Sequence, residues 1–466
     1  MDRMSMLLGQ LTPIYNGAHL IQDESLTRRA GKWILLVMTQ VHALVPIIAG
    51  VIMVYMMLIG RSLSTLEFWV LMASCLELEF YLYCVVLHKR LQVRRSMAPR
   101  TPEERRILTQ QLLAHPEGLA SMITRWFLPL GKRLLSRSRL DTFFAWCMFD
   151  CRMEEMGAED RAELDQLVEI ALQRVPGIVG SQEVDTEGFM TMNFDPMVVQ
   201  HKPLMVYMAI WTLQAAGYAM LLAMGFKRLH SKGMNYWLYQ PKTTSNEAPA
   251  FFIHGIGIGL VMYCNMVRQL VVKKPNRPVI LLELPHVGVS LSGAVPSMDQ
   301  TLCAVDSILK SHSFSQCTFV GHSYGTLIAA WIAKHRPNLV ARLVLIDPVC
   351  FLVWEPSLIY NFLYSKPMSF TQFMCQFYVS NDMYVSHTLR RHFWWFENNL
   401  FPEFLTTFKT KVFLAERDYI IDAPFINDYL KRATDPAYVD VTQFPNISHG
   451  NYLNSQKHMD TIISHV

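Results

Sequence analysis

The fold is decided by one stretch of the sequence, residues 317–335, which read CTFVGHSYGTLIAAWIAKH. The first four residues predict a buried strand, and the residues from 326 onward predict a helix. The turn between them carries a G-x-S-x-G motif, formed by Gly321, His322, Ser323, Tyr324 and Gly325. In a strand–turn–helix context, this motif lifts the serine to a position that a substrate and a base can both reach. We therefore predict that Ser323 is a nucleophile, the alternative being an ordinary serine in a surface turn.

A nucleophilic serine needs backbone donors for the negative charge that develops on the attacked carbonyl oxygen. A second glycine-rich motif, HGIGIG at residues 254–259, follows an apolar strand predicted from residue 250. We expect the backbone amides of Ile256 and Tyr324 to form this oxyanion hole. The residues expected to support the site are His254, Gly255 and Gly257.

The same glycines leave a second interpretation open, a nucleotide-binding loop. Glu283, near the end of the next predicted strand, would then be the carboxylate that binds the ribose. The spacing is G-x-G-x-G, however, and the third glycine position of the G-x-G-x-x-G fingerprint is missing. A nucleotide site would also leave the G-x-S-x-G motif unexplained, so we favour the oxyanion loop.

The serine also needs a base, and an acid that orients this base. Asp418 follows a strand predicted at 411–414, and His449 follows the last predicted strand and precedes Gly450. The order Ser323, Asp418, His449 is the chain order that a nucleophile elbow of this type requires. Three other carboxylates remain open for the acid, in this order of preference: Asp422 and Glu416 together, and then Asp347.

Short β-rich runs alternate with helical stretches from residue 236 to the C-terminus, which is typical of an α/β sheet. The predicted strands are Tyr236–Tyr239, Ala250–His254, Pro278–Leu284, Cys317–Val320, Arg342–Ile346, Lys411–Leu414 and Tyr438–Phe444.

These features together resemble the α/β-hydrolase superfamily over roughly the second half of the chain. Four of them match in order, namely His254-Gly255, the Ser323 motif, Asp418 and His449-Gly450. The resemblance implies an α/β-hydrolase sheet with a helical cap. Serine at the nucleophile position argues against the epoxide hydrolases and dehalogenases of this fold, which use aspartate there. Three further segments are similar to a poorly characterised group of membrane-linked hydrolases: Leu284–Val287, Asp347–Phe351 and His392–Asn398.

The expected cap lies at residues 351–410, an insertion of 60 residues with 17 aromatic side chains. Such a density of aromatic residues gives a large apolar surface. We expect an apolar pocket or membrane-facing lip that accepts an acyl chain, the alternative being a cap that only needs its own core. The basic residues of this segment are expected to form a solvated face, the alternative being contact with lipid headgroups. They are His387, Arg390, Arg391 and His392.

The composition predicts a protein that is partly embedded in a membrane. Hydrophobic residues make up 51% of the chain and charged residues 17%, against roughly 25% charged residues in ordinary globular chains. Residues 33–60 carry no formal charge and are long enough to span a bilayer. Residues 66–88 form a second candidate span, although Glu77 and Glu79 lie near its middle. The flanking basic residues predict a hairpin with both ends in the cytosol.

A third uncharged stretch, residues 203–226, either spans the bilayer or lies along its surface as a monotopic helix. The polar segment before it predicts helices, one of which starts at a capping box, Thr101–Glu104. We therefore divide the chain into three regions. These are a membrane hairpin region at 1–100, a helical connector at 101–230 that includes the apolar helix 203–226, and an α/β-hydrolase domain at 231–466.

We expect a multi-pass endomembrane protein whose catalytic domain faces the cytosol. Nine scattered cysteines without a CxxC pair fit reduced thiols. The N-x-S sequon at Asn446 immediately precedes His449, so a lumenal enzyme would risk a glycan at its own active site. Basic residues directly after the third stretch also favour a cytosolic domain. The length of that stretch, however, would allow it to span the bilayer and place the domain on the other side.

The sequence thus predicts a membrane-anchored serine hydrolase that cleaves carboxylic esters, with a lipid or apolar ester as substrate and the bilayer as partner. The alternatives are an acyltransferase that uses the same serine, and a non-catalytic membrane protein with a hydrolase scaffold. A net charge of +4 gives no reason to expect nucleic acid. No cofactor or metal is expected, because Cys147 and Cys151 share a helical face but have no nearby histidine pair.

Overall fold

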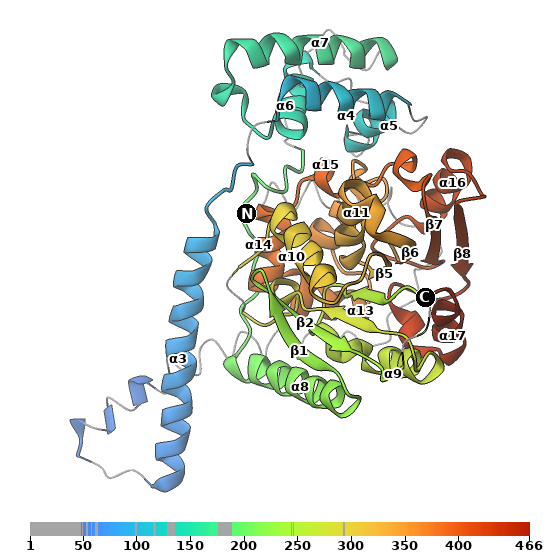
Figure 1. Cartoon of the computed structure of the whole chain (residues 1–466). Helices are drawn as coiled ribbons and strands as arrows, with labels where there is room; N and C mark the ends of the chain where they lie inside the picture. The colour runs from blue at the N-terminus through green and yellow to red at the C-terminus, as the bar shows by residue number, and fades with distance from the viewer. Residues whose placement is uncertain are drawn as a thin grey trace.

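The computed structural model describes residues 64–97, 100–114, 118–127, 136–175, 189–243, 245, 247–291 and 294–466, with part of 48–60. The described chain contains a sheet domain with a cap, a small helical bundle and two long apolar helices (Figure 1). The first predicted span, residues 33–60, lies mostly outside the described residues and stays a prediction.

The described residues form one sheet of eight strands in the order β1-β2-β4-β3-β5-β6-β7-β8. The first two pairings of this order are antiparallel and the other five are parallel. Every residue of β3, β4 and β5 is buried, as expected for parallel strands with helices on both faces. The strands are β1 Lys227–Ser231, β2 Met234–Tyr239, β3 Ala250–Ile253, β4 Val279–Leu282, β5 Cys317–His322, β6 Val340–Ile346, β7 Lys409–Ala415 and β8 Val439–Phe444.

Strands β2 to β8 lie within two residues of the seven predicted strands at each end. The sequence pattern does not predict β1, because Lys-Arg-Leu-His-Ser has the composition of a polar flank. This strand pairs with β2 alone and forms the edge of the sheet, where charged side chains can stay in solvent. The sheet therefore begins at Lys227, inside the segment that the sequence assigns to the connector.

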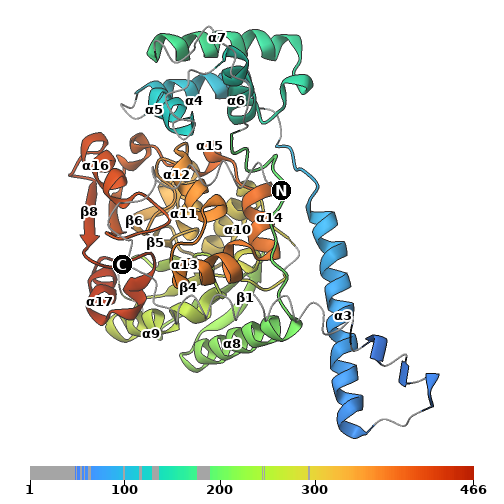
Figure 2. The same ribbon diagram turned by 180° about the vertical axis from the view of Figure 1, so that it is seen from behind.

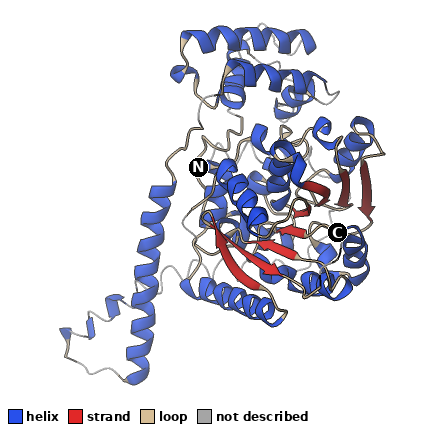
Figure 3. Cartoon of the chain, in the orientation of Figure 1, coloured by secondary structure: helices blue, strands red, loops and turns tan. Residues whose placement is uncertain are grey.

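Helices cover both faces of the sheet (Figure 3). On one face the core includes residues of α10, α11 and α16, and on the other face residues of α9 and α17. Alternate residues of β5 point to opposite faces, so that Phe319 joins the first core and Val320 the second. The helices are α9 Cys264–Lys273, α10 Met298–Ser311, α11 Gly325–His335, α16 Ala423–Ala433 and α17 Gln456–His465.

The insertion between β6 and β7 is a helical cap. Its helices are α12 Pro356–Ile359, α13 Phe370–Cys375, α14 Met383–Arg391 and α15 Trp395–Asn398. The expected solvated basic face is wrong, because Arg390 and Arg391 are only 2% and 3% exposed. Both guanidinium groups point inward and donate to backbone carbonyl groups, Arg390 to Leu363 at 3.3 Å and Arg391 to Asn193 at 3.2 Å.

The connector forms a small bundle on the cap side of the sheet domain (Figure 1). Its helices are α4 Pro102–Ala114, α5 Leu119–Phe127, α6 Arg137–Phe149 and α7 Ala158–Arg174. The predicted capping box is present, with the Thr101 amide donating to the Glu104 carboxylate at 2.7 Å. Indole hydrogen bonds of 2.8 Å join the bundle to the cap, from Trp126 to the Trp354 carbonyl and from Trp395 to the Cys147 carbonyl.

Two helices of the described chain are long and apolar enough to cross a membrane, by length and composition alone: α3 Thr65–Leu91 and α8 Leu204–Ala223. The helix α3 contains the second predicted span, residues 66–88, and α8 lies within the third uncharged stretch, residues 203–226. The Glu77 carboxylate of α3 accepts hydrogen bonds of 2.9 and 3.1 Å from the Leu204 amide at the start of α8. An anion at a helix N-terminus is stabilised by the helix dipole, which gives this glutamate a partner.

The helix α8 lies across one end of the sheet domain, while α3 stands beside it (Figures 1 and 2). One face of α8 is buried, through Tyr207, Ile210, Gly217 and Leu221. The contact with the 3₁₀ turn Gly259–Tyr263 is close, since a Cβ atom on Gly217 would lie 2.7 Å from Cβ of Val261. The helix is apolar on its other sides too, and its exposed large residues are Met205, Met208, Trp211, Leu213, Met220 and Leu222.

Candidate active site

The backbone between β5 and α11 makes a sharp turn at Ser323. This serine has a φ of +50°, in the left-handed region that residues with a Cβ atom rarely adopt. The turn is held by backbone hydrogen bonds, from the Ser323 amide to the Ile346 carbonyl at 3.0 Å and from the Thr326 amide to the Ser323 carbonyl at 2.9 Å. The Thr326 hydroxyl also donates to the Ser323 carbonyl at 2.6 Å. Three contacts therefore keep the serine in its strained conformation.

The glycines of the motif are required by close backbone approach. A Cβ atom on Gly325 would lie 2.2 Å from the carbonyl oxygen of Ile253, and one on Gly321 would lie 2.8 Å from the carbonyl oxygen of Gly325. Gly255 meets the turn from the other side, because a Cβ atom there would lie 2.9 Å from Cβ of Ser323. The two glycine-rich motifs, far apart in sequence, therefore pack directly against each other.

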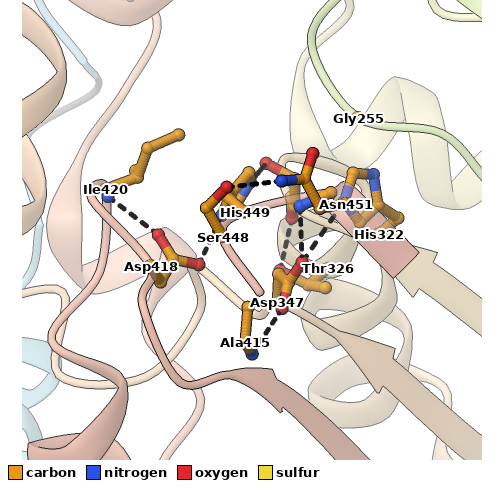
Figure 4. Close-up of polar contacts among 12 residues, drawn as sticks. Gly255, His322, Thr326, Asp347, Ala415, Asp418, Ile420, Ser448, His449 and Asn451 are labelled. Carbon is orange, nitrogen blue, oxygen red and sulfur yellow. Dashed lines mark hydrogen bonds and ion pairs between the residues drawn. The ribbon is translucent and has the colours of Figure 1, made fainter. Parts of the chain in front are cut away.

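The structure brings Ser323, His449 and Asp418 together at the carboxyl ends of the strands. Figure 4 shows Asp418 beside His449, with Asp347 below them. Nε2 of His449 lies 2.8 Å from Oγ of Ser323, and Nδ1 lies 2.6 Å from Oδ2 of Asp418. The other carboxylate oxygen of Asp418 accepts the amides of Ile420 at 2.8 Å and Ile421 at 3.1 Å. The imidazole can therefore donate from Nδ1 to the carboxylate and accept the serine proton at Nε2.

The other candidate acids have different partners. Glu416 accepts the Asn446 amide at 2.7 Å, and Asp422 accepts the Phe425 amide at the start of α16 at 3.2 Å. Asp347 is buried beside the site, where it accepts the Ala415 amide at 2.9 Å and the Gly450 amide at 2.8 Å. Asp347 thus holds the loop that carries the histidine, whereas Asp418 contacts the imidazole itself.

Asp347, Asp418 and His449 also form the one group in the described chain that could hold a metal ion by spacing, with ligand atoms within 4.8 Å of one another. The described contacts already use both carboxylates as acceptors, for backbone amides and for the imidazole. Each of the three side chains therefore already has a hydrogen-bond partner among the described residues.

The imidazole of His449 has an altered affinity for protons. Burial alone would lower its pKa, but the neighbouring Asp418 carboxylate raises the pKa to about 9. The carboxylate stabilises the charged imidazolium relative to the neutral ring, and the raised pKa expresses this stabilisation. Burial raises the pKa of Asp347 to about 6 in the same pocket, although the charge of His449 opposes this shift.

Two backbone amides near the serine are the candidate donors for an oxyanion. Ile256 and Tyr324 both line the cavity that contains Ser323. Within the described part of the chain, neither amide has a hydrogen-bond acceptor. Tyr324 follows Ser323 at the start of α11, where the N–H groups of the first turn have no helical partner and the helix dipole favours negative charge.

The supporting residues form a buried network of neutral groups. His254 accepts the Leu284 amide at Nε2 (3.0 Å) and donates from Nδ1 to the Gly255 carbonyl at 2.8 Å, and burial lowers its pKa to about 4. The Tyr263 hydroxyl accepts the Gly255 amide at 3.1 Å and lies 2.7 Å from Nδ1 of His322, whose pKa is lowered by burial. The amide of Gly257 donates to the Val287 carbonyl at 3.1 Å, which fixes the rest of the loop.

Three residues of this framework are absent from the site expected from sequence, or have a different role in it. In the sequence, Tyr263 and Thr326 look like ordinary buried residues of a helical stretch, and no motif marks either of them as part of a site. Asp347 ends a strand, and that position identifies it as an acid near the site but not as the partner of Gly450.

The carboxylate that a nucleotide site would need, that of Glu283, already has other partners. The Glu283 carboxylate is buried and pairs with the Arg228 guanidinium at 2.8 and 2.9 Å, and it also accepts the indole N–H of Trp237. These contacts tie β1 and β2 to the end of β4, so that this carboxylate is used inside the sheet domain.

A cavity of about 620 Å³ lies over the serine and histidine. Its walls are mainly apolar and come from the cap, from the oxyanion loop and from a turn that carries Met192. Ligand pockets of this kind typically measure about 300–1,000 Å³. A water molecule occupies roughly 30 Å³, and a methylene group is of similar size, so the cavity holds on the order of twenty such groups.

Comparison with known proteins agrees with this fold. A family model described as alpha/beta hydrolase fold matches residues 250–373. The sn-1-specific diacylglycerol lipase ABHD11 of Danio rerio is 28% identical over 102 residues, which cover 22% of this chain and 32% of the relative. The protein of the same name from Xenopus laevis is 29% identical over 102 residues, covering 21% and 31%. The chain thus spans about a third of the length of these curated relatives.

Two solved structures cover 56% of this chain. One is described as a membrane phospholipase A, a novel bacterial virulence factor, with a TM-score of 0.39, 15% identity and 93% of its own chain covered. The other is carboxylesterase CesB (YbfK) from Bacillus subtilis, with a TM-score of 0.39, 10% identity and 97% of its own chain covered. The strand order, the turn at Ser323 and the family match establish that this chain belongs to the α/β-hydrolase superfamily.

Proposed function

We propose that this protein is a membrane-anchored serine hydrolase that cleaves carboxylic esters of lipids. The observation that carries the proposal is the chain of contacts from Ser323 to His449 to Asp418 at the floor of a large apolar cavity. The curated relatives are named as lipases, which supports ester hydrolysis as the reaction class.

In the proposed reaction, Oγ of Ser323 attacks the ester carbonyl carbon while Nε2 of His449 accepts its proton. The negative charge on the carbonyl oxygen is stabilised by the amides of Ile256 and Tyr324. His449 then gives the proton to the leaving alcohol, and an acyl-enzyme on Ser323 remains. Water, deprotonated by the same imidazole, releases the acid and restores the serine.

The substrate class is inferred from the cavity. Its volume of about 620 Å³ and its apolar walls suit one long acyl chain together with the ester group. The alternative within the same site is acyl transfer, in which an alcohol takes the place of water. A scaffold without catalysis is disfavoured, because it would have no use for a serine that is strained by roughly 1–3 kcal/mol.

The first prediction concerns the nucleophile. Ser323→Ala should lower ester hydrolysis by roughly 10⁴-fold or more, because no other group on the cavity floor forms the acyl-enzyme. The purified full chain is assayed with a p-nitrophenyl ester and with a fluorophosphonate label. Ser448→Ala is the matched control, since Ser448 directly precedes His449. In the described contacts, its hydroxyl group accepts a hydrogen bond only from the side-chain amide of Asn451. Undiminished turnover in Ser323→Ala would refute the proposal.

The second prediction concerns pH. The base acts only when neutral, so kcat/KM should rise with pH up to about 9, where the Asp418 carboxylate places the pKa of His449. In Asp418→Asn this carboxylate is lost and burial lowers the pKa instead. The rising limb should therefore move to lower pH by roughly one to three units, while kcat falls about 10⁴-fold.

The control for this variant is Asp422→Asn, four residues along the same loop. Asparagine keeps the cap on α16, so the pH profile should coincide with that of the natural chain. If Asp422→Asn moved the rising limb and Asp418→Asn did not, the acid would be assigned wrongly.

We further propose that α3 and α8 attach the enzyme to the bilayer. A helix that is apolar on all sides belongs in a protein core or a membrane, and α8 has only one buried face. In Figure 2, α8 runs crosswise to the direction of α3. If α3 spans the bilayer, α8 then lies along the membrane surface. The turn on which α8 packs carries Met262, which is exposed and lines the cavity. The cavity therefore opens beside the proposed membrane surface.

The third prediction tests this surface. Met208→Glu and Leu222→Glu, at exposed positions of α8, should lower hydrolysis of a long-chain ester in vesicles by roughly tenfold, since charged groups are costly in a bilayer. Hydrolysis of a short water-soluble ester should not change. Ile107→Glu is the control, because Ile107 is also exposed but lies on α4, at the other end of the molecule (Figure 1). Equal losses in all three variants would contradict the assignment of α8.

The fourth prediction concerns orientation, and we propose that the active site faces the cytosol. All nine cysteines are free, as expected in a reducing compartment. A glycan on Asn446 would lie three residues from His449. A C-terminal tag should therefore be digested by protease added to sealed microsomes. A protected tag or a glycosylated Asn446 would place the domain on the lumenal side.

A further inference from the structure

We propose that Met192, which lies outside the hydrolase sheet and its cap, closes the buried end of the cavity and sets the length of the acyl chain that the enzyme accepts. The inference rests on the proposed function and adds a specificity-determining residue to it. Met192 belongs to the segment between the helical bundle and α8, a part of the chain where the sequence shows no site.

The exposed fractions of the lining residues show which end of the cavity is open to solvent and which end is buried. Met262, Asn451 and Asn454 line it and are exposed, so they form its rim. Met192, at 4% exposure, and Phe393, at 5%, also line it and form its buried wall. An acyl chain attached at Ser323 and extending away from solvent would therefore meet Met192 and Phe393.

Behind this wall lies a second pocket of only about 20 Å³. Met192, Ile359 and Phe393 line both spaces, so these three side chains form the partition between them. The remaining walls of the small pocket are large aromatic residues of the bundle and the cap, among them Trp126, Trp146, Trp354 and Trp395. Shortening Met192 would join the two spaces and lengthen the cavity, whereas a bulkier residue would shorten it.

The turn that carries Met192 is fixed by the bundle. The Phe194 amide donates to the Thr191 carbonyl at 2.8 Å, which closes the turn around Met192. The indole N–H of Trp146 donates to the Asn193 side chain at 2.7 Å, and the amide of that side chain donates to the Asp150 carboxylate at 2.5 Å. These partners are buried, so the hydrogen bonds are costly to break.

The cap holds the same turn from the other side. The guanidinium of Arg391 donates to the carbonyl groups of Asn193 at 3.2 Å and Asp195 at 3.0 Å. The Tyr364 hydroxyl donates to the Asp195 carboxylate and accepts from Arg390 at 3.1 Å. Because the bundle and the cap both hold the backbone of this turn, Met192 cannot move aside when an acyl chain is too long for the cavity. This arrangement also explains why two arginines of the cap are buried.

The test compares chain-length profiles. The full-length protein, Met192→Ala and Met192→Phe are assayed with p-nitrophenyl esters of 12, 16 and 20 carbons, and kcat/KM is measured for each ester. One methylene group in an apolar pocket changes kcat/KM by about tenfold or more. Met192→Ala should therefore raise the ratio of the 20-carbon to the 12-carbon ester by roughly tenfold, and Met192→Phe should lower it by a similar factor.

Met262→Ala is the matched control, because it shortens a methionine of the same cavity at its rim. It should change the rates for all three esters by a common factor and leave the ratio as it is. Fluorophosphonate labelling of every variant reports whether the active site is folded.

Each outcome decides the question. A labelled Met192→Ala with an unchanged length ratio would overturn the inference, and so would a change of equal size in Met262→Ala. If Met192→Ala failed to label, Met192→Phe alone would decide, since a merely structural residue would lower all rates together without favouring short chains. Failure of the proposed function is a separate result, because then no ester would depend on Ser323 in the natural chain.

Discussion

The left-handed backbone of Ser323 is the constraint on which the other parts of the site depend. A serine at a φ of +50° is strained, and the turn persists because its surroundings hold it. The α-carbon of Gly325 is so close to the Ile253 carbonyl that even a methyl group would clash at 2.2 Å. This contact fixes the start of α11 against the end of β3. Tyr324 and Ile256 thereby line the same cavity, and the serine oxygen is turned toward the histidine.

The polar groups beneath this turn divide into two kinds. His254 and His322 are buried among backbone groups and a tyrosine hydroxyl, and burial keeps both rings neutral. His449 is buried as well, but the Asp418 carboxylate at 2.6 Å raises its pKa instead. Of three neighbouring imidazoles, two thus have a lowered pKa, and His449 has a raised one. Of the three rings, only His449 is hydrogen-bonded to a carboxylate, since the Asp347 carboxylate lies 3.9 Å from Nε2 of His322. This hydrogen-bonded carboxylate accounts for the higher pKa of His449.

The segments outside the hydrolase sheet are bonded to it through a few buried contacts. Trp126 and Trp395 join the bundle to the cap, and Arg391 joins the cap to the turn at Met192. On the opposite side, Gly217 allows α8 to pack against the turn that follows the oxyanion loop. The apolar helix α8 is therefore in direct contact with the framework of the site. One residue of the cavity wall, Met192, comes from outside the hydrolase fold.

The sequence by itself determined seven of the eight described strands and the positions of the candidate serine, the candidate histidine and the glycine-rich loop. These depend on local patterns: apolar runs of strand length, glycines at fixed spacing and residues that follow strand ends. It favoured Asp418 as the acid but left Asp422, Glu416 and Asp347 open, since all four come near strand ends and only the folded loop directs one carboxylate to Nδ1 of His449. The edge strand β1 was not predictable either, because its residues are polar and its pairing with β2 supplies the stability. The burial of Arg390 and Arg391, the partners of Tyr263 and the position of Met192 were decided by tertiary structure alone. Each depends on groups many residues away in the chain, and a charged or apolar side chain carries no local sign of the distant backbone against which it will pack.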